Sequence, residues 1–371
     1  MKKHSKKIGT ISYNKYCNFT NYGSALQTWA LHQAIKKIDG FQPVLVDYCP
    51  DILADKDPLN PFSNMWDKDE ESKRMCELTM PAIRENYRKF DTFYKIRFDR
   101  TSQNYTAGNF DEISKEELDG YVCGSDTIFC PDEFGVDDGY YANYAPLRGH
   151  SVAYAASFGD PTMTVDVSKQ VSERLKNFKA IGLRENLMIP YVKRQTKAPV
   201  QKVIDPTLLL TPEEYEPITE DRIVDEKYLL LYSRRYSPEM EEYAEKVAKG
   251  NGWKIVEISL RATNADKGHI MFYRAGVEEF LSLVKNAEFV VTNSFHGMIF
   301  SVQFSRPFVV FSREQCNTKI EELIQLFGIE DHIFITGKEL YKPINYDMVH
   351  LNIKYSRAES ERFLRHELEL L

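Results

Sequence analysis

The residues best placed for chemistry lie in the segment EFVVTNSFHGMIFSVQFSRPFV, residues 288–309. Its first apolar run predicts a strand and its second a helix, with Asn293, Ser294, His296 and Gly297 at the junction. Free N–H groups and the helix dipole at such a point favour an anion. Ser294 fits the helix N-cap. His296 follows in the first turn, where we favour a catalytic or binding role over a purely structural one.

The opening segment NFTNYGSALQ, residues 18–27, has the same arrangement of a strand followed by a helix N-terminus. Asn21 or Thr20 can cap the helix, and Gly23 permits a close approach of the backbone to a ligand. A capped turn explains these residues as well as ligand contact does. Asn21, Tyr22 and Gly23 are therefore candidate substrate-binding residues.

The segment VCGSD, residues 122–126, places glycine and short polar residues after another predicted strand. Gly124 and Ser125 are candidates for substrate binding. Asp126 is a candidate base, although capping of the next element is its simpler role.

Arginines follow two further predicted strands. Arg184 stands in GLREN, and Arg234 and Arg235 stand in LYSRRY. A guanidinium binds phosphate or carboxylate in a bidentate manner, so cations at strand ends predict an anion site.

The elements that position these residues alternate between strand and helix, which predicts an α/β fold. Residues 1–192 are expected to form a first Rossmann-like domain, with an insertion at about 55–110. That insertion breaks the alternation and carries one amphipathic helix, Ala82–Phe98, which we expect to dock on its own protein. The remaining predicted elements of this domain are strands Ile8–Tyr13, Val44–Tyr48, Tyr121–Cys123, Ser151–Ala155 and Ala180–Leu183 and a helix, Val167–Phe178.

A polar stretch, Pro190–Pro199, is typical of a linker, and residues 200–345 are expected to form a second Rossmann-like domain. Ligands of such sheets bind at the carboxyl ends of the strands, which predicts a site in a central cleft between the two domains. Residues 346–371 are assigned to a C-terminal region whose last part, Ser356–Leu371, is an amphipathic helix, with the first domain as its candidate packing surface. The predicted elements of the second domain are strands Tyr228–Tyr232, Lys254–Ser259, Glu288–Thr292 and Pro307–Phe311 and helices Pro238–Lys249, Val277–Lys285, Phe295–Phe304 and Thr318–Phe327.

Composition narrows the classes of function. The chain has 371 residues and a net charge of −7, which argues against nucleic acid as a main partner. The 6 cysteines and 8 histidines show no ligand spacing, so we expect no metal. No apolar run approaches the ~18 residues of a membrane span, and MKKHSKK is followed by no secretory core. A cytoplasmic protein is expected.

Six motifs in order resemble the polysaccharide pyruvyl transferase family. They are KIGTISYNKYCNFTNYGSALQTWALHQAI, VCGSDTIF, SVAYAASFG, IGLREN, VIDPTLLL and VVTNSFHGMIFSVQFSRPFVVF, and NTKIEELIQLFGI fits as well. The resemblance implies two Rossmann-like domains in the GT-B arrangement of many glycosyltransferases. It also implies phosphoenolpyruvate as donor, a pyruvate ketal on a hexose as product, and no further cofactor. Its catalytic histidine falls at His296 and its anion-binding arginine at Arg184.

One position departs from the family pattern. Many relatives carry an arginine where Ser294 stands, and that arginine contacts the donor. The resemblance therefore requires another cation here, with Arg234, Arg235, Arg313 and Lys319 as candidates.

Two other functions stay open on the sequence. A glycosyltransferase of the same architecture would use a nucleotide sugar, and a non-catalytic relative would only bind carbohydrate. If the acceptor is a lipid-linked repeat unit, MKKHSKK or the basic helix near residue 90 could contact anionic lipid at the inner membrane face.

Overall fold

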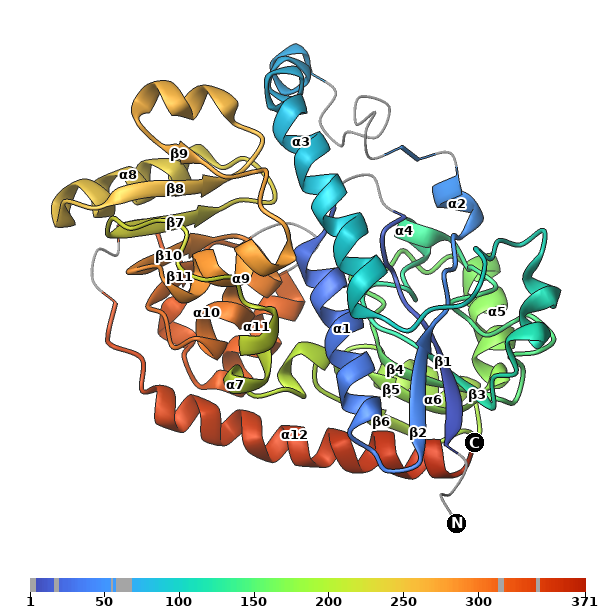
Figure 1. Cartoon of the computed structure of the whole chain (residues 1–371). Coiled ribbons are helices and arrows are strands. Elements are labelled where there is room, and N and C mark those ends of the chain that lie inside the picture. The colour runs from blue at the N-terminus through green and yellow to red at the C-terminus, as the bar shows by residue number, and fades with distance from the viewer. Residues whose placement is uncertain (1–4, 17–19, 55, 58–68, 313–316, 338–340) are drawn as a thin grey trace.

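A computed structural model describes residues 5–16, 20–54, 56–57, 69–312, 317–337 and 341–371 (Figure 1). The described chain forms two parallel sheets, which confirms the predicted α/β class. The first has the order β2-β1-β3-β4-β5-β6 and the second β11-β10-β7-β8-β9. The strands of the first sheet are β1 Lys6–Ile11, β2 Phe41–Leu45, β3 Gly120–Cys123, β4 Ser151–Ala156, β5 Phe178–Leu183 and β6 Val200–Lys202. Those of the second are β7 Tyr228–Tyr232, β8 Lys254–Ile258, β9 Ile270–Met271, β10 Phe289–Thr292 and β11 Phe308–Val310.

The central strands are largely apolar and buried, as expected of parallel sheets whose two faces are covered by helices. All residues of β3, β4 and β7 are buried. The helices of the first half are α1 Tyr22–Lys36, α2 Asp51–Ala54, α3 Glu70–Arg97, α4 Pro131–Phe134, α5 Val165–Arg174 and α6 Ile189–Gln195. Those that follow are α7 Pro212–Tyr215, α8 Pro238–Asn251, α9 Val277–Lys285, α10 Phe295–Gln303, α11 Asn317–Phe327 and α12 Tyr346–Glu369. Short 3₁₀ turns complete the list: Phe110–Glu116, Leu175–Asn177, Pro206–Leu208, Glu216–Ile218, Ala262–Lys267 and Glu330–His332.

Helix α1 joins the two halves. It contacts α9 and α10 of the second half as well as β2 of the first, and nearly all of its residues are buried. This position explains why the helix carries apolar residues on more than one side.

Helix α3 begins at Glu70, so the predicted start at Ala82 is wrong. Its apolar side, which includes Ile83, Phe90 and Tyr94, is buried. Two of its basic residues pair with α9: Lys89 Nζ lies 2.8 Å from Glu279 Oε2, and Arg97 Nη2 lies 2.7 Å from Glu278 Oε1. The helix near residue 90 thus docks on its own protein.

The linker predicted at Pro190–Pro199 is wrong. Residues Ile189–Gln195 form α6, because a proline fits the first turn of a helix without loss of a hydrogen bond. Strand β6 then pairs with β5, so the first sheet extends beyond the predicted end at residue 192.

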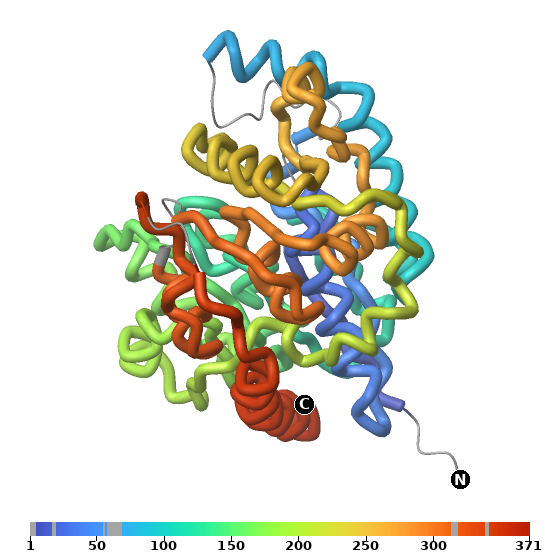
Figure 2. Tube along the Cα trace, turned by 90° about the vertical axis from the view of Figure 1, so that its left-hand side faces the viewer, coloured from blue at the N-terminus to red at the C-terminus, as the bar shows by residue number. Residues whose placement is uncertain are grey.

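Helix α12 runs beneath both sheets and back toward the N-terminus of the chain (Figures 1 and 2). It begins at Tyr346, ten residues before the predicted helix start at Ser356, because Asn345 caps it by accepting from Met348 N. The helix contacts α11 as well as β4 and β5. Ser360 Oγ accepts a hydrogen bond of 3.0 Å from Ile204 N.

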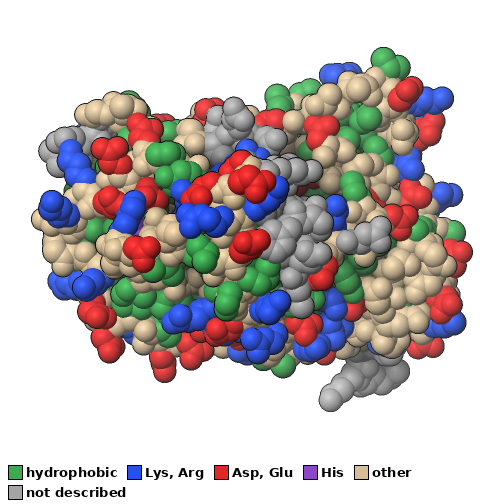
Figure 3. All heavy atoms as spheres, turned by 90° about the horizontal axis from the view of Figure 1, so that it is seen from above, with side chains coloured by type: hydrophobic (Ala, Val, Ile, Leu, Met, Phe, Trp, Pro, Cys, Tyr) green, Lys and Arg blue, Asp and Glu red, His purple; other side chains and the backbone are tan. Residues whose placement is uncertain are grey.

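Acidic and basic side chains are interspersed over the face seen in Figure 3, with no broad basic area. Within the described ranges, no helix combines the length and the hydropathy that a membrane crossing requires.

Candidate active site

The N-termini of α1 and α10 meet at the junction of the two halves. Asn21 caps α1, since its side chain accepts from Gly23 N at 3.0 Å and Ser24 N at 3.4 Å. Ser294 caps α10 by accepting from Gly297 N at 3.2 Å. The ring of His296 lies so close to Gly23 that a Cβ there would overlap Nδ1. The observed position of the His296 ring therefore requires a glycine at position 23.

His296 also faces a buried carboxylate. Its Nε2 lies 3.5 Å from Asp205 Oδ2, which is an ion-pair distance rather than a hydrogen bond. This nitrogen is buried and hydrogen-bonds no atom of the described residues. The imidazole therefore keeps hydrogen-bonding capacity that a ligand could use.

Asp205 follows β6 and is nearly inaccessible, at 2% exposure. It accepts hydrogen bonds from Gln27 Nε2 at 2.5 Å and from Thr207 N through its other oxygen at 3.0 Å. Arg184 Nη1 lies 3.1 Å from Asp205 Oδ2. Burial alone would raise the pKa of this carboxyl, but His296 and Arg184 hold that pKa below its usual value.

Arg184 is already neutralised by protein groups. Its Nε donates to Glu185 Oε1 at 2.9 Å, and its guanidinium lies 5.0 Å from the centre of the Phe295 ring. Although burial disfavours the charge, Glu185 and Asp205 raise the pKa of Arg184. The predicted anion ligand thus forms a buried network with two carboxylates.

Asp126 completes this group of charges. Its φ of 74° lies in the left-handed region, which is uncommon for a residue with a side chain. Ser24 Oγ donates to its carboxylate. Burial raises the pKa of Asp126, yet Arg184, His296, Ser24 and Lys319 together lower it. Asp126 is therefore a carboxylate at neutral pH.

The residues before Asp126 in VCGSD are buried and closely packed. Gly124 approaches Tyr154 O so closely that no Cβ fits, and its own carbonyl accepts from Ser12 Oγ. Ser125 Oγ is buried without a hydrogen bond to a described residue.

A cavity of about 490 Å³ opens beside this group. Arg184 and Asp205 of the first half line it together with Phe295 and Lys319 of the second. The cavity lies at the carboxyl ends of strands, where ligands of open α/β sheets bind.

One protein family matches most of the chain: its description is polysaccharide pyruvyl transferase, and it matches residues 21–315. The chain belongs to this family. The matched range contains His296, Asp205, Arg184 and Asp126.

Solved structures of other proteins have the same fold as this chain. A UDP-GlcNAc 2-epimerase from Methanocaldococcus jannaschii has a TM-score of 0.53 and 12% identity, over 97% of this chain and 98% of that one. A protein from Listeria monocytogenes described as a UDP-N-acetylglucosamine 2-epimerase has a TM-score of 0.52 and 11% identity, over 96% and 90% of the two chains. At these identities the likeness shows the fold alone, which is the predicted GT-B-like arrangement. No curated protein sequence matches the chain.

Other residues that the sequence predicted for the site make hydrogen bonds and packing contacts within the protein. Asn293 accepts from Arg234 N at 2.8 Å and donates to Arg235 O at 2.7 Å, so it fixes the loop after β7. Gly297 packs against Thr292 with no room for a side chain. Arg234 Nη1 donates to Thr20 O at 3.3 Å, which places this cation near the start of α1.

Tyr22 lies apart from the group. Its ring stacks on Phe280 at 4.4 Å and its hydroxyl donates to Ala275 O at 2.8 Å. Its role is to pack α1 against α9, and the expectation of substrate contact finds no support in this position. Arg313 lies outside the described residues.

Asp205, Ser24 and Gln27 are the residues that sequence reasoning missed. All three stood inside quoted motifs, and Asp205 follows the end of β6 by three residues, as Asp126 follows the end of β3, but β6 itself was not predicted. Among the described residues, no cluster of three or more His, Cys, Asp or Glu has the arrangement of a metal site.

Proposed function

We propose that the chain transfers the pyruvyl group of phosphoenolpyruvate to a hexose of a polysaccharide or lipid-linked repeat unit, as a ketal. The observation that carries the proposal is the contact of His296 with Gly23 and Asp205 at the paired helix N-termini, inside the family's matched range. A protonatable ring that lies beside the carboxylate of Asp205 and at two helix N-termini, whose dipoles favour an anion, suits proton transfer next to an anionic substrate.

The reaction needs two proton movements. A proton must reach the methylene carbon of the donor, so that the neighbouring carbon accepts a sugar hydroxyl. Phosphate then leaves, and a second hydroxyl of the sugar closes the ketal. Of the two hydroxyl protons, one is accounted for by the new methyl group and the other leaves with phosphate.

We assign the proton transfers to His296. The lowered pKa of Asp126 makes it a weak proton acceptor, so its role is to orient an acceptor hydroxyl. Asp205 positions the His296 ring, and Arg184 compensates the buried charge of Asp205. These two are positioning residues.

The donor carries a phosphate and a carboxylate that need cations. Since Arg184 is neutralised by Glu185 and Asp205, we assign the donor's anionic groups to Lys319 and to Arg234 and Arg235 after β7. These residues would replace the arginine that relatives carry at position 294.

Thermal unfolding of the full chain with and without phosphoenolpyruvate tests the proposal. At a hundredfold excess over the dissociation constant, a ligand of the folded state stabilises it by about 2.7 kcal/mol. We expect a raised midpoint in the wild type, a smaller rise in Lys319→Gln, and an unchanged rise in Lys169→Gln, an exposed control on α5.

A second assay follows phosphate release with candidate hexosides. His296→Asn should abolish turnover and keep the unfolding midpoint. A midpoint raised by UDP-N-acetylglucosamine and unaffected by phosphoenolpyruvate would overturn the proposal in favour of a nucleotide-sugar enzyme.

With phosphoenolpyruvate as donor, the site of action is the cytoplasm, at the inner membrane face if the acceptor is lipid-linked. Lys89 and Arg97 of α3 are paired with α9, but Arg84 and Arg88 of the same helix are exposed, so membrane contact would involve these arginines or the segment MKKHSKK. Failure to co-sediment with anionic vesicles at low salt would remove this part of the proposal.

A further inference from the structure

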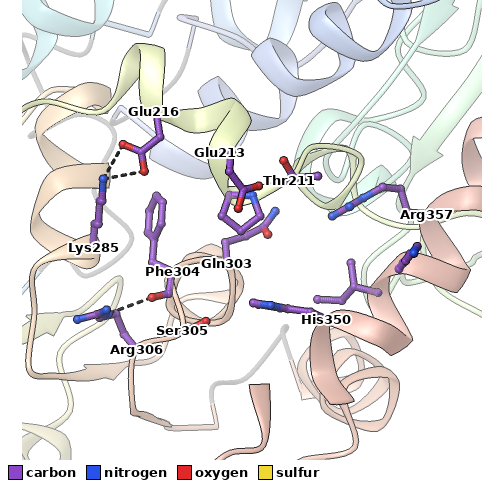
Figure 4. A pocket seen from close by; sticks show the side chains of 13 residues that line it. Thr211, Glu213, Glu216, Lys285, Gln303, Phe304, Ser305, Arg306, His350 and Arg357 are labelled. Atoms are coloured by element: carbon purple, nitrogen blue, oxygen red, sulfur yellow. Dashed lines mark hydrogen bonds and ion pairs between the residues drawn. The ribbon is translucent and has the colours of Figure 1, made fainter. Parts of the chain in front are cut away.

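A second cavity, of about 590 Å³, lies at the opposite end of α10 from His296 (Figure 4). Its walls come from the C-terminal end of α10 and the residues after it, from α7 with its flanking residues, from the end of α9, and from α12. The lining residues used below are Glu213, Lys285, Ser305, His350, Lys354 and Arg357. The volume is in the range of small-molecule sites.

Three of these residues share one face of α12. His350, Lys354 and Arg357 follow one another at spacings of four and three residues, which brings their side chains to the same side of a helix. Figure 4 shows His350 and Arg357 entering the cavity from this helix.

The cations of this face make no short ion pair among the described residues, although the carboxylates of Glu361, Glu214 and Glu213 act on Arg357 at longer range. Lys285 is paired with Glu216 at 2.6 Å, but neither Lys354 nor Arg357 forms an ion pair with any residue in the described ranges. Arg357 instead donates to two carbonyls, from Nε to Leu208 O at 2.7 Å and from Nη2 to Leu210 O at 3.0 Å.

Burial lowers the pKa of the Arg357 guanidinium, so this cation is partly desolvated. The carboxylates of Glu361, Glu214 and Glu213 offset part of the desolvation cost of Arg357, and an anionic ligand in direct contact would offset the remainder. The Nε2 of His350 lies 3.1 Å from Val302 O and donates to it, so the ring can also donate to an anion, from Nδ1, when it is protonated.

The rest of the cavity wall contributes a carboxylate, a hydroxyl and an aromatic ring. The carboxylate of Glu213 makes no ion pair within 4 Å of a described residue, and its pKa is lowered by a hydrogen bond from Thr211 and by the charges of His350 and Arg357. Ser305 has a φ of 54°, and its hydroxyl hydrogen-bonds no described residue. Phe304 adds an apolar surface. Carboxylate, hydroxyl and ring together suit the hydroxyls and the apolar face of a sugar.

We propose that this cavity binds a sugar phosphate, with the phosphate on His350, Lys354 and Arg357 and the sugar hydroxyls on Glu213 and Ser305. The site is separate from the proposed pyruvyl transfer site and does not depend on that proposal. Gln303, in its wall, donates to Thr207 O at 2.8 Å, so an occupant would contact the elements that carry His296 and Asp205.

The test measures binding to the full chain at constant ionic strength by calorimetry and thermal unfolding, with glucose 6-phosphate, inorganic phosphate and glucose as probes. We expect glucose 6-phosphate to bind more tightly than phosphate, and glucose to have no effect. Lys354→Glu should weaken glucose 6-phosphate at least tenfold.

Two matched variants locate the site. Arg365→Glu makes the same charge change on an exposed position of the same helix and should leave binding unchanged. His296→Asn should also leave it unchanged. Absence of binding in the wild type, full binding in Lys354→Glu, or loss of binding in His296→Asn would each overturn the proposal.

Discussion

At the scale of single residues, the candidate site depends on a contact between the two halves of the chain. Gly23 belongs to the first turn of α1 and His296 to the first turn of α10, and the ring occupies the space that a side chain at position 23 would need. Asp205 approaches the same ring at 3.5 Å from a third element. These two neighbours restrict where the imidazole can lie.

Gly23→Ala is expected to reduce turnover at least a hundredfold, because the new methyl group must displace the His296 ring. Steady-state kinetics and unfolding midpoints measure the two effects separately. Gly250→Ala is the control, since Gly250 lies in α8 with open space around its Cα. That variant should keep full activity and gain up to about 1 kcal/mol. Wild-type kinetics in Gly23→Ala would contradict the described geometry.

The buried carboxylate should make stability depend on pH. Because the folded-state pKa of Asp205 is lowered, the folded protein binds fewer protons there than the unfolded chain does. Its stabilising contribution is present above the unfolded pKa of about 3.9 and is lost as the pH falls through the folded value. The difference in unfolding free energy between wild type and Asp205→Asn should therefore be largest near pH 7 and shrink below about pH 4. Urea titrations at several pH values measure it, and a difference that stays constant would refute this role.

At the scale of elements, α10 is defined at both ends by hydrogen bonds. Ser294 caps its start, while Ser305 N donates to Val302 O at 3.0 Å and Arg306 N to Ser301 O at 2.7 Å at its end. This is the pattern of a Schellman motif, whose left-handed position is usually a glycine. Here Ser305 holds that position with a φ of 54°.

Ser305→Gly should raise the unfolding free energy by about 1 kcal/mol, because glycine adopts this conformation without steric cost. Ser305→Ala keeps a Cβ and should give no such gain. Chemical denaturation of the two variants provides the comparison. Equal stability of both would show that the backbone conformation at this position is not strained.

At the scale of the whole molecule, α12 ties the second half to the first. Its C-terminal part packs on the first sheet, where Phe363 is 6% exposed, lies against Gly182 and has its ring 6.5 Å from that of Tyr154. Arg357 of the same helix holds the carbonyls of Leu208 and Leu210.

Phe363→Ala should destabilise the protein by about 3–5 kcal/mol, as for other buried aromatic residues. Tyr355→Ala on the same helix removes a side chain that is 67% exposed and should change stability little. Calorimetric scans of both variants test the packing. Similar midpoints for the two would show that the end of α12 contributes little to the fold.

The segments with a clear apolar pattern were the part of the fold that the sequence predicted best. The segment Tyr228–Tyr232 is a strand over the predicted range, and Val277–Lys285 is a helix over the predicted range. The polar strand β6 was missed because Val200–Lys202 is short and lies at the edge of its sheet. Helix α6 was missed because Pro190 was interpreted as part of a linker, although proline is compatible with a first helical turn.

The sequence predicted the site less completely than the fold. Strand ends pointed to His296, Asp126 and Arg184, but a sequence does not show which charges neutralise one another. Glu185 is adjacent to Arg184 in the chain, but the pairing of Arg184 with Asp205 depends on β5 and β6 being neighbours in the sheet. Cations that look available along the chain can be fully compensated in the folded protein.

The contact between Gly23 and His296 also constrains how related proteins can diverge. A mutation that adds a side chain at position 23 would be tolerated only with a smaller residue at position 296 or with a shift of α10. Positions far apart in the chain should therefore change together. A selection for second-site suppressors of Gly23→Ala should recover substitutions near the start of α10, and it would trace this dependence without any assay of the reaction.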